Sequence, residues 1–258
     1  EKRIDFLKKL KIENICIDTE GAQIRTSFIK KEIFFPKKKI VNIFNEDYPG
    51  NKDSIYLNPK FNISNIKKNT IIDIGFNGLS LKVLSFNKKE YFLRCLVVTE
   101  GVLGANKGVH INSEIYLPPL TDKDKYALNL AKRKGVKYIA VSFVNSSMDI
   151  DEVKKIYGNK NFIISKIETL NAIKNLRSIA KKSNAMLIDR GDLSRYIPIE
   201  KIPIIQENIL EFSKKNSFET FVATNLLETM IVENQPTRAE SHDIYSTLLQ
   251  GSQGLVLA

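Results

Sequence analysis

The sequence predicts an α/β fold built on a parallel sheet, with a small β domain inserted near its N-terminal end. Short apolar runs alternate with amphipathic helical patterns, and the runs are apolar at nearly every position, as strands buried on both faces are. Residues 28–113 lack this alternation and instead carry β-like runs broken by Lys- and Asn-rich turns. With 258 residues, 43% of them hydrophobic, the chain can bury a sizeable core.

Six apolar runs are the predicted parallel strands. They are Asn14–Thr19, Tyr138–Phe143, Phe162–Glu168, Ala185–Asp189, Thr220–Thr224 and Gly254–Ala258. Each run is 5 to 7 residues long, which suits a strand better than a helix. Strands that alternate with helices indicate repeated strand–helix units and therefore a parallel sheet.

Five amphipathic segments between these runs are the predicted helices. The first follows Thr121, an N-cap with an acid three residues later, and ends at Gly135. The others are predicted at Asp149–Ile156, Asn171–Lys182, Pro203–Lys215 and Thr237–Gln250. The β-like runs of the insert are Ile71–Ile74, Leu79–Ser85 and Tyr91–Val98.

The composition narrows the class of protein only a little. There are 40 Lys and Arg against 29 Asp and Glu, a net charge of +11, which fits nucleic acid, anionic lipid or a phosphorylated small substrate. Only 8 of the 40 are Arg, and the abundant Lys, Ile and Asn share A/T-rich codons, so the surplus gives nucleic acid little support. No apolar run approaches the ~20 residues of a membrane helix, so no membrane partner is expected.

The cysteines and histidines are too few for a structural framework. Cys16 and Cys95 are isolated, so we expect a reducing compartment, the cytoplasm or an organelle matrix, and no secretion. His110 and His242 are solitary, which disfavours a zinc site.

Polar residues at the end of the third apolar run form the sharpest candidate site. Lys166 and Glu168 are two residues apart, so they share one face of a strand. An ammonium and a carboxylate buried together are costly unless they pair or serve a site. From spacing alone, an ion pair at a strand end and a functional pair are equally good interpretations.

Further candidates follow three other predicted strands. Asp192 comes just after the strand Ala185–Asp189, and with Glu168 it offers carboxylate oxygens to Mg²⁺; the alternative is a turn acid that caps the next helix. Asp18 and Thr19 offer further hard oxygen ligands. Nearby Arg25 suits a phosphate, and the hydroxyl of Thr224 suits either a substrate or a helix cap.

Taken in order, these motifs resemble those of the pyruvate kinase family. Ile17–Thr26 is similar to the family's Leu-Asp-Thr-Lys-Gly-Pro-Glu-Ile-Arg-Thr. The further matching stretches are Lys107–Val109, Leu117–Pro118, Thr121–Asp124, Ser165–Glu168, Arg190–Leu193, Ala223–Met230 and Pro236–Glu240. The resemblance is strong over residues 14–27 and 100–258 and faint over 28–99.

The resemblance implies a fold and an organisation. The family has a TIM-type (β/α)8 barrel with a small β-barrel domain inserted after its third strand, so the six runs correspond to strands three to eight of the eight. Residues 1–27 and 114–258 are then the barrel domain, and 28–113 are the insert. A closed barrel needs eight strands. We therefore expect the chain to form a homo-oligomer or to be part of a longer polypeptide or a larger assembly.

The resemblance also implies a reaction and a role for each matching residue. The reaction is transfer of a phosphoryl group from phosphoenolpyruvate to ADP, which gives pyruvate and ATP. Lys166 and Thr224 would be catalytic, and Glu168 and Asp192 would bind Mg²⁺ or Mn²⁺. Gly191 and Asp192, with Thr224, would bind the substrate. Asp18 and Thr19 would bind a monovalent cation such as K⁺. Arg25 and Lys107 would contact the nucleotide phosphates.

Several positions depart from the family pattern. Glu20 stands where the family has Lys, and Asn145 replaces a basic residue. Asp189 replaces a small residue, and Ser194 replaces Gly. An additional carboxylate beside the amides expected to hold the substrate's carboxylate opposes its binding. Two hypotheses therefore remain: a pyruvate kinase, or a divergent paralogue that is structural or acts on another enolate-forming substrate.

Overall fold

The computed structural model of the protein describes residues 1–21, 23–75, 78–113 and 115–257. The chain divides into two compact units, one of Glu1–Gly21 with Pro119–Ala258 and the other of Ala22–Pro118. Each unit has its own apolar core. The predicted domain boundary at residue 114 falls on a residue outside the described part of the chain.

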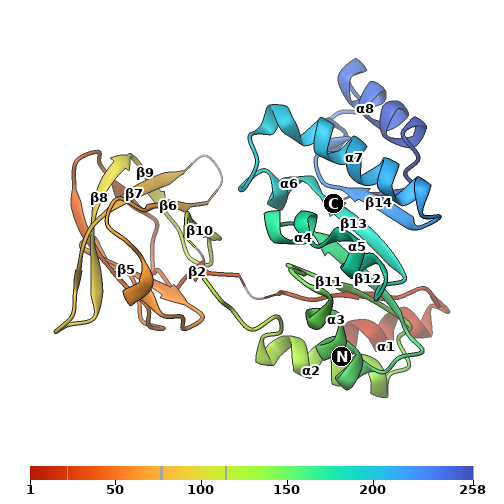
Figure 1. Cartoon of the computed structure of the whole chain (residues 1–258), viewed down its shortest axis with the longest axis horizontal. Coiled ribbons are helices and arrows are strands. Elements are labelled where there is room, and N and C mark those ends of the chain that lie inside the picture. The colour runs from red at the N-terminus through yellow and green to blue at the C-terminus, as the bar shows by residue number, and fades with distance from the viewer. Residues whose placement is uncertain (22, 76–77, 114, 258) are drawn as a thin grey trace. The chain divides into compact units, whose positions relative to one another are not determined.

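Six parallel strands form the sheet of the first unit, in the order β1-β11-β12-β13-β14-β15 (Figure 1). They are β1 (Cys16–Asp18), β11 (Tyr138–Val141), β12 (Phe162–Ile167), β13 (Ala185–Asp189), β14 (Glu219–Ala223) and β15 (Gly254–Val256). Every residue of β13 is buried, as expected for a strand covered on both faces. The predicted α/β character is therefore confirmed, and the sheet is barrel-like and nearly closed. The last predicted run ends at Ala258, outside the described residues.

The register of this sheet brings the carboxyl ends of its strands to one edge. Asp18 of β1 is paired with Ala140 of β11, and Asp189 of β13 is paired with Ala223 of β14. In a parallel sheet, the residues that follow each strand then lie side by side. The predicted site residues of the first unit, Asp18, Thr19, Lys166, Glu168, Gly191, Asp192 and Thr224, lie at or just beyond this edge.

Helices follow the strands of the first unit (Figure 1). They are α1 (Lys2–Lys9), α2 (Asp122–Arg133), α3 (Ser147–Tyr157), α4 (Leu170–Lys174), α5 (Leu176–Ala180), α6 (Arg190–Leu193), α7 (Ile202–Lys215) and α8 (Arg238–Leu249), with 3₁₀ turns at Ile199–Lys201 and Glu228–Ile231. None of the helices among the described residues is long and apolar enough to cross a membrane.

The prediction of one helix over Asn171–Lys182 was wrong, because the chain forms two short helices, α4 and α5, joined at Asn175. The side chain of Asn175 donates a hydrogen bond to the carbonyl of Asn145, 2.8 Å away. This partner lies 30 residues earlier in the chain. A tertiary contact of this kind leaves no trace in the local hydrophobic period.

A buried carboxylate joins the start of α2 to the segment after β1. Thr121 and Asp124 form the predicted capping box. Asp124 is only 2% exposed, and its carboxylate also accepts the backbone N–H groups of Glu20 at 2.7 Å and Gly21 at 3.1 Å. One side chain therefore satisfies donors from two distant segments of the chain.

Tyr157 ties α3 to the loop before β11. Its ring is buried, and its hydroxyl donates to the carbonyl of Val136. A Tyr157→Phe variant is expected to lose about 1–3 kcal/mol of unfolding free energy, because that buried carbonyl is left without a donor. Urea denaturation measures the loss. The control is Tyr116→Phe, since Tyr116 is 85% exposed; equal losses in the two variants would refute this role for Tyr157.

Glu240, three residues after the N-cap Thr237, stabilises the start of α8. Its carboxylate accepts hydrogen bonds from the Thr229 hydroxyl, from Thr229 N at 2.9 Å and from Thr237 N at 2.8 Å. These bonds, led by that from the Thr229 side chain, lower the pKa of Glu240 to about 2.

A Glu240→Gln variant is expected to have a pH-dependent deficit in melting temperature. Because the folded-state pKa is below the unfolded value of about 4.3, the wild-type carboxylate stabilises the fold fully above that value, and the benefit disappears as the pH falls towards 2. Melting curves between pH 2 and 7 measure the difference between the two proteins. Glu207→Gln, on an exposed position of α7, should show a difference that does not vary in this way.

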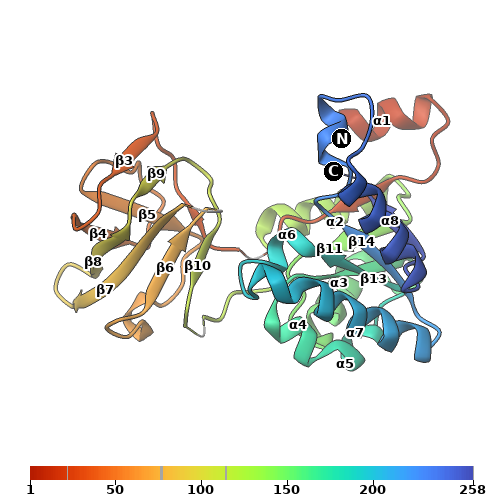
Figure 2. The same cartoon turned by 90° about the horizontal axis from the view of Figure 1, so that it is seen from above.

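The second unit is built almost entirely from antiparallel strands (Figure 2). They are β2 (Arg25–Thr26), β3 (Ile33–Phe35), β4 (Ile40–Phe44), β5 (Ser54–Asn58), β6 (Ile71–Ile74), β7 (Leu79–Asn87), β8 (Phe92–Thr99), β9 (Gly101–Leu103) and β10 (Val109–Ile111). Seven of them form one sheet in the order β10-β6-β7-β8-β4-β5-β2, and β3 pairs with β9. An isolated β-bridge between Arg25 of β2 and Gly108, the residue just before β10, links the first and last strands of this sheet.

Candidate functional site

Lys166 lies at the centre of an acidic group at the carboxyl edge of the first unit's sheet. Its ammonium nitrogen is 2.9 Å from Glu168 Oε1, 3.4 Å from Asp189 Oδ2 and 3.4 Å from Asp18 Oδ2. Burial by itself lowers the pKa of Lys166, but the attraction of Glu168, Asp18 and Asp189 outweighs burial and raises it above its ordinary value. The surrounding carboxylates therefore favour the charged form of Lys166.

Glu168 is the most deeply buried carboxylate of this group. It is 0% exposed, and desolvation raises its pKa to about 7, although Lys166 and the N–H of Phe143 oppose the shift. The backbone of Phe143 donates to Oε2, and Oε1 forms an ion pair with the ammonium of Lys166. Both partners compensate part of the cost of burying this carboxylate.

Three carboxylates of the group suit a divalent cation. One oxygen each from Glu168, Asp189 and Asp192 lies within 4.8 Å of the others. All three are hard oxygen donors, which Mg²⁺ and Mn²⁺ prefer. This donor set fits the metal expected from the sequence.

The turn between β13 and α6 pairs its own backbone amides with side chains. Asp189 is the N-cap of the four-residue helix α6, and its Oδ1 accepts from Asp192 N at 3.3 Å. The amide of Gly191 donates to Thr224 Oγ1 at 2.8 Å. Thr224 Oγ1 in turn lies 3.3 Å from Asp189 Oδ1 and donates to the carbonyl of Ala223. The backbone N–H groups expected to receive a substrate carboxylate therefore already have partners.

Asp18 and Thr19 are linked to the end of β11 through Ser142. The hydroxyl of Ser142 donates to the Thr19 carbonyl at 2.7 Å and lies 3.1 Å from Asp18 Oδ1. The amide of Ser142 donates to Thr19 Oγ1 at 2.9 Å, and Lys166 Nζ is 3.3 Å from Ser142 Oγ. The predicted residues Asp18 and Thr19 are thus brought to the same group as Lys166.

Arg190 fixes the loop that carries Thr224. Its guanidinium forms a bidentate ion pair with Asp243 of α8, at 2.8 and 2.9 Å, and donates to the carbonyls of Thr224 and Asn225. A planar guanidinium holds several acceptors in one orientation. Residues Thr224 and Asn225 have positive φ angles of 71° and 54°, so this loop needs such support.

The structure places the remaining predicted residues in the second unit. Arg25 Nη1 donates to the carbonyl of Asn106 at 3.1 Å, and the amide of Lys107 donates to Thr26 Oγ1 at 2.8 Å. Arg25 and Lys107 are therefore neighbours within that unit.

Two members of the group were missed or misjudged from the sequence. Ser142 was not named as a site residue, although it directly follows an apolar strand as the other candidates do. Asp189 was interpreted only as a charge that opposes substrate binding, whereas its carboxylate faces both Lys166 and the two other acids. The position of each residue at a strand end was the available signal.

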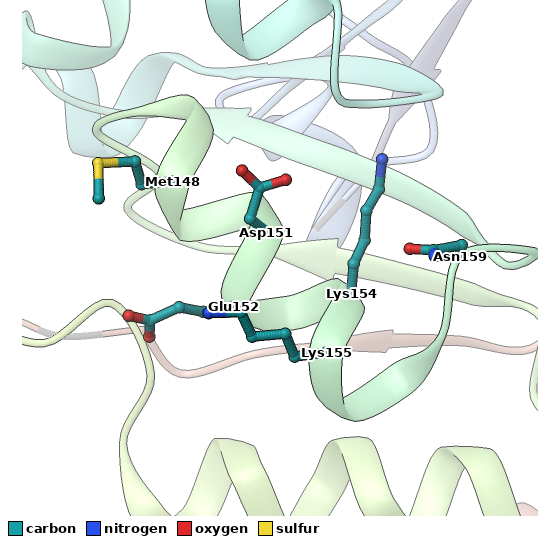
Figure 3. A pocket seen from close by; sticks show the side chains of 6 residues that line it. All are labelled: Met148, Asp151, Glu152, Lys154, Lys155 and Asn159. Atoms are coloured by element: carbon teal, nitrogen blue, oxygen red, sulfur yellow. The ribbon is translucent and has the colours of Figure 1, made fainter.

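A hollow elsewhere on the first unit is distinct from this group. Its lining side chains come from α3 and the turn after it (Figure 3), namely Met148, Asp151, Glu152, Lys154, Lys155 and Asn159. None of the predicted site residues lines it. The hollow therefore adds nothing to the chemistry at the strand ends.

Comparison with known proteins identifies the family. Residues 4–258 match the family model described as pyruvate kinase, barrel domain. Similar proteins include the pyruvate kinase of Thermotoga maritima, 32% identical over 256 residues (97% of this chain, 54% of the relative), and that of Methanocaldococcus jannaschii, 33% identical over 262 residues (100% and 56%). The cytosolic isozyme of Nicotiana tabacum is 33% identical over 253 residues (95% and 50%). The chain spans about half the length of the curated relatives it matches. The resemblance predicted from the motifs is confirmed, and the chain belongs to the pyruvate kinase family.

Proposed function

We propose that the protein containing this chain is a pyruvate kinase that transfers a phosphoryl group from phosphoenolpyruvate to ADP. The observation that carries the proposal is the buried Lys166 ammonium among the carboxylates of Glu168, Asp189 and Asp18, at the carboxyl edge of a parallel sheet. In barrel enzymes this edge holds the active site. We also propose that the sheet belongs to an eight-stranded TIM-type barrel, with residues 28–113 as its insert.

Glu168 and Asp192 are the residues that would hold Mg²⁺ or Mn²⁺. Their oxygens are close together, and Glu168 Oε1, which is 2.9 Å from the Lys166 ammonium, would be shared between Lys166 and the ion. A bound divalent ion stabilises negative charge as it develops on the substrate oxygens. The protein's own contribution is to fix these carboxylates by burial and by the Phe143 amide.

Lys166 would neutralise charge on the transferring phosphoryl group and on the enolate oxygen. Phosphoryl transfer depends mainly on positioning and electrostatic stabilisation, and a fixed ammonium in a dry site is strong in that role. Its ion pairs with Glu168, Asp189 and Asp18 hold the ammonium in place before substrate arrives. The Thr224 hydroxyl would assist protonation of the enolate.

The remaining roles complete the proposal. Gly191 and Asp192 would bind the substrate's carboxylate through their amides, and Asp18 with Thr19 would bind K⁺. Arg25 and Lys107 would contact the nucleotide phosphates. To bind the substrate, the amides of Gly191 and Asp192 must release their present acceptors, Thr224 Oγ1 and Asp189 Oδ1.

The test is formation of pyruvate by the full-length protein as the cell makes it. Phosphoenolpyruvate, ADP and Mg²⁺ are supplied, and pyruvate and ATP are measured separately. Both products should appear in equal amounts and only when ADP is present. Turnover no faster than that of a Lys166→Met variant would refute the proposed activity.

A second function is favoured by the paired amides of the α6 turn. Because Gly191 N and Asp192 N already donate to this chain's own side chains, a substrate carboxylate has to compete for them. This favours a divergent paralogue that is structural or acts on another enolate-forming substrate. Calorimetric binding of phosphoenolpyruvate in the presence of Mg²⁺ separates the two: a pyruvate kinase binds it, and the structural paralogue does not.

A further inference from the structure

Asp189 is an uncommon residue for the end of a buried strand. Its side chain is 10% exposed, and it occupies the last position of β13, where every other residue is apolar. Its hydrogen bonds are long: Asp192 N and Thr224 Oγ1 each lie 3.3 Å from Oδ1, and Lys166 Nζ lies 3.4 Å from Oδ2. Capping a helix of four residues does not by itself account for a buried charge, because a buried carboxylate is costly.

The geometry around Asp189 matches a metal shell. An octahedral Mg²⁺ site with metal–oxygen distances of about 2.1 Å places its ligand oxygens roughly 3 to 4 Å apart. Oxygens of Glu168, Asp189 and Asp192 already lie within 4.8 Å of one another. Small side-chain rotations of the two aspartates therefore bring all three within reach of one ion.

A second observation is the position of the Glu168 carboxylate. This side chain is 0% exposed, its Oε2 accepts a hydrogen bond from the Phe143 amide, and its Oε1 is 2.9 Å from the Lys166 ammonium. A cation already occupies the centre of the carboxylates in the form of Lys166. The site is thus built to hold positive charge next to Glu168 and Asp189.

Carboxyl groups outnumber cationic side chains in the group. The four carboxyl groups of Asp18, Glu168, Asp189 and Asp192 lie beside two cationic side chains, Lys166 and Arg195, of which Arg195 pairs with Asp192 at 3.1 Å. Asp189 therefore adds to the attraction of the group for a further cation.

We propose that Asp189 is a third carboxylate ligand for the divalent cation, so that this chain holds the ion in the absence of substrate. The identity of the ion rests on the proposed function, whereas the role of Asp189 rests on the geometry above. Asp189 then takes a place in the shell that a site with two carboxylates leaves to the substrate. The same residue also weakens the attraction for an anionic substrate, since it adds negative charge beside the ion.

Binding of Mn²⁺ to the full-length protein without substrate tests the proposal. Electron paramagnetic resonance counts unbound Mn²⁺ and gives the affinity directly, with no turnover involved. Asp189→Asn keeps an oxygen that can cap α6 and removes only the charge, and it should weaken Mn²⁺ binding by 10-fold or more. Asp151→Asn makes the same chemical change on α3, where Asp151 pairs with Lys182, and should leave the affinity within 2-fold.

The outcomes separate this inference from the proposed function. Mn²⁺ affinity of Asp189→Asn within 2-fold of the wild type, or no Mn²⁺ binding by the wild type, overturns the inference. If Glu168→Gln loses Mn²⁺ and Asp189→Asn does not, the two-carboxylate site and the proposed function stand while the inference falls. If Mn²⁺ binding depends on Asp189 but no pyruvate forms, the inference stands and the proposed function falls. Melting curves without metal show that each variant is folded.

Discussion

A Lys166→Met variant is expected to lose about 10²–10³-fold in kcat for pyruvate formation, while its affinity for a divalent cation rises. Methionine keeps most of the length and volume of lysine but has no charge, so the transition state loses one fixed electrostatic partner, which typically costs that factor. The same change removes the ammonium that lies 2.9 Å from Glu168 and 3.4 Å from Asp189, so a competing cation leaves the carboxylates.

Opposite changes in the two measurements distinguish this role from simple unfolding. Steady-state kinetics gives kcat, and Mn²⁺ titration gives the affinity of the same preparation. Lys182→Met is the matched control, because Lys182 is 46% exposed and pairs with Asp151 outside the site. A Lys166→Met variant with wild-type kcat, or one in which Mn²⁺ binding is lost together with kcat, would contradict the expectation.

A Gly21→Ala variant is expected to destabilise the first unit by about 2–5 kcal/mol. Gly21 has a φ angle of +71°, which costs an L-residue roughly 1–2 kcal/mol. A β-carbon there would also lie 2.8 Å from Phe143 Cδ2 and 3.0 Å from the Ser142 carbonyl oxygen, and such overpacking costs about 1–3 kcal/mol more. Because Ser142 and Phe143 carry contacts to Asp18 and Glu168, the strain reaches the acidic group.

Gly135 supplies the control for that substitution. It has a φ angle of +58°, but nothing lies within 4 Å of the position of an added β-carbon. Gly135→Ala should therefore show the backbone strain without the collision, a loss of only about 1–2 kcal/mol. Urea denaturation of both variants measures the difference. Equal losses would show that the contact with Phe143 carries no cost.

The elements of the first unit could be predicted because strands buried on both faces have a strong sequence pattern. Ala185–Asp189 was predicted with its observed bounds, and its five positions are all buried. The break at Asn175 could not be predicted from the local pattern, and the contact found there, a hydrogen bond to Asn145, joins residues that are 30 positions apart.

The candidate site could be predicted only where its residues are close in sequence. The two-residue period of a strand placed Lys166 and Glu168 on one face. Contacts between distant strand ends had no such signal: Ser142 and Asp18 are 124 residues apart, and Lys166 and Asp18 are 148 apart. The charge of Asp189 could be read from the sequence, but only the fold shows which charged groups face it.

The carboxylate of Asp124 has a consequence for how the first unit tolerates changes elsewhere in the chain. It accepts hydrogen bonds from the amides of Glu20 and Gly21, at the end of the first stretch of this unit, and it caps α2, just after the unit resumes at Pro119. All of these partners belong to the first unit. Substitutions between residues 22 and 118 therefore leave every donor and acceptor of this network in place.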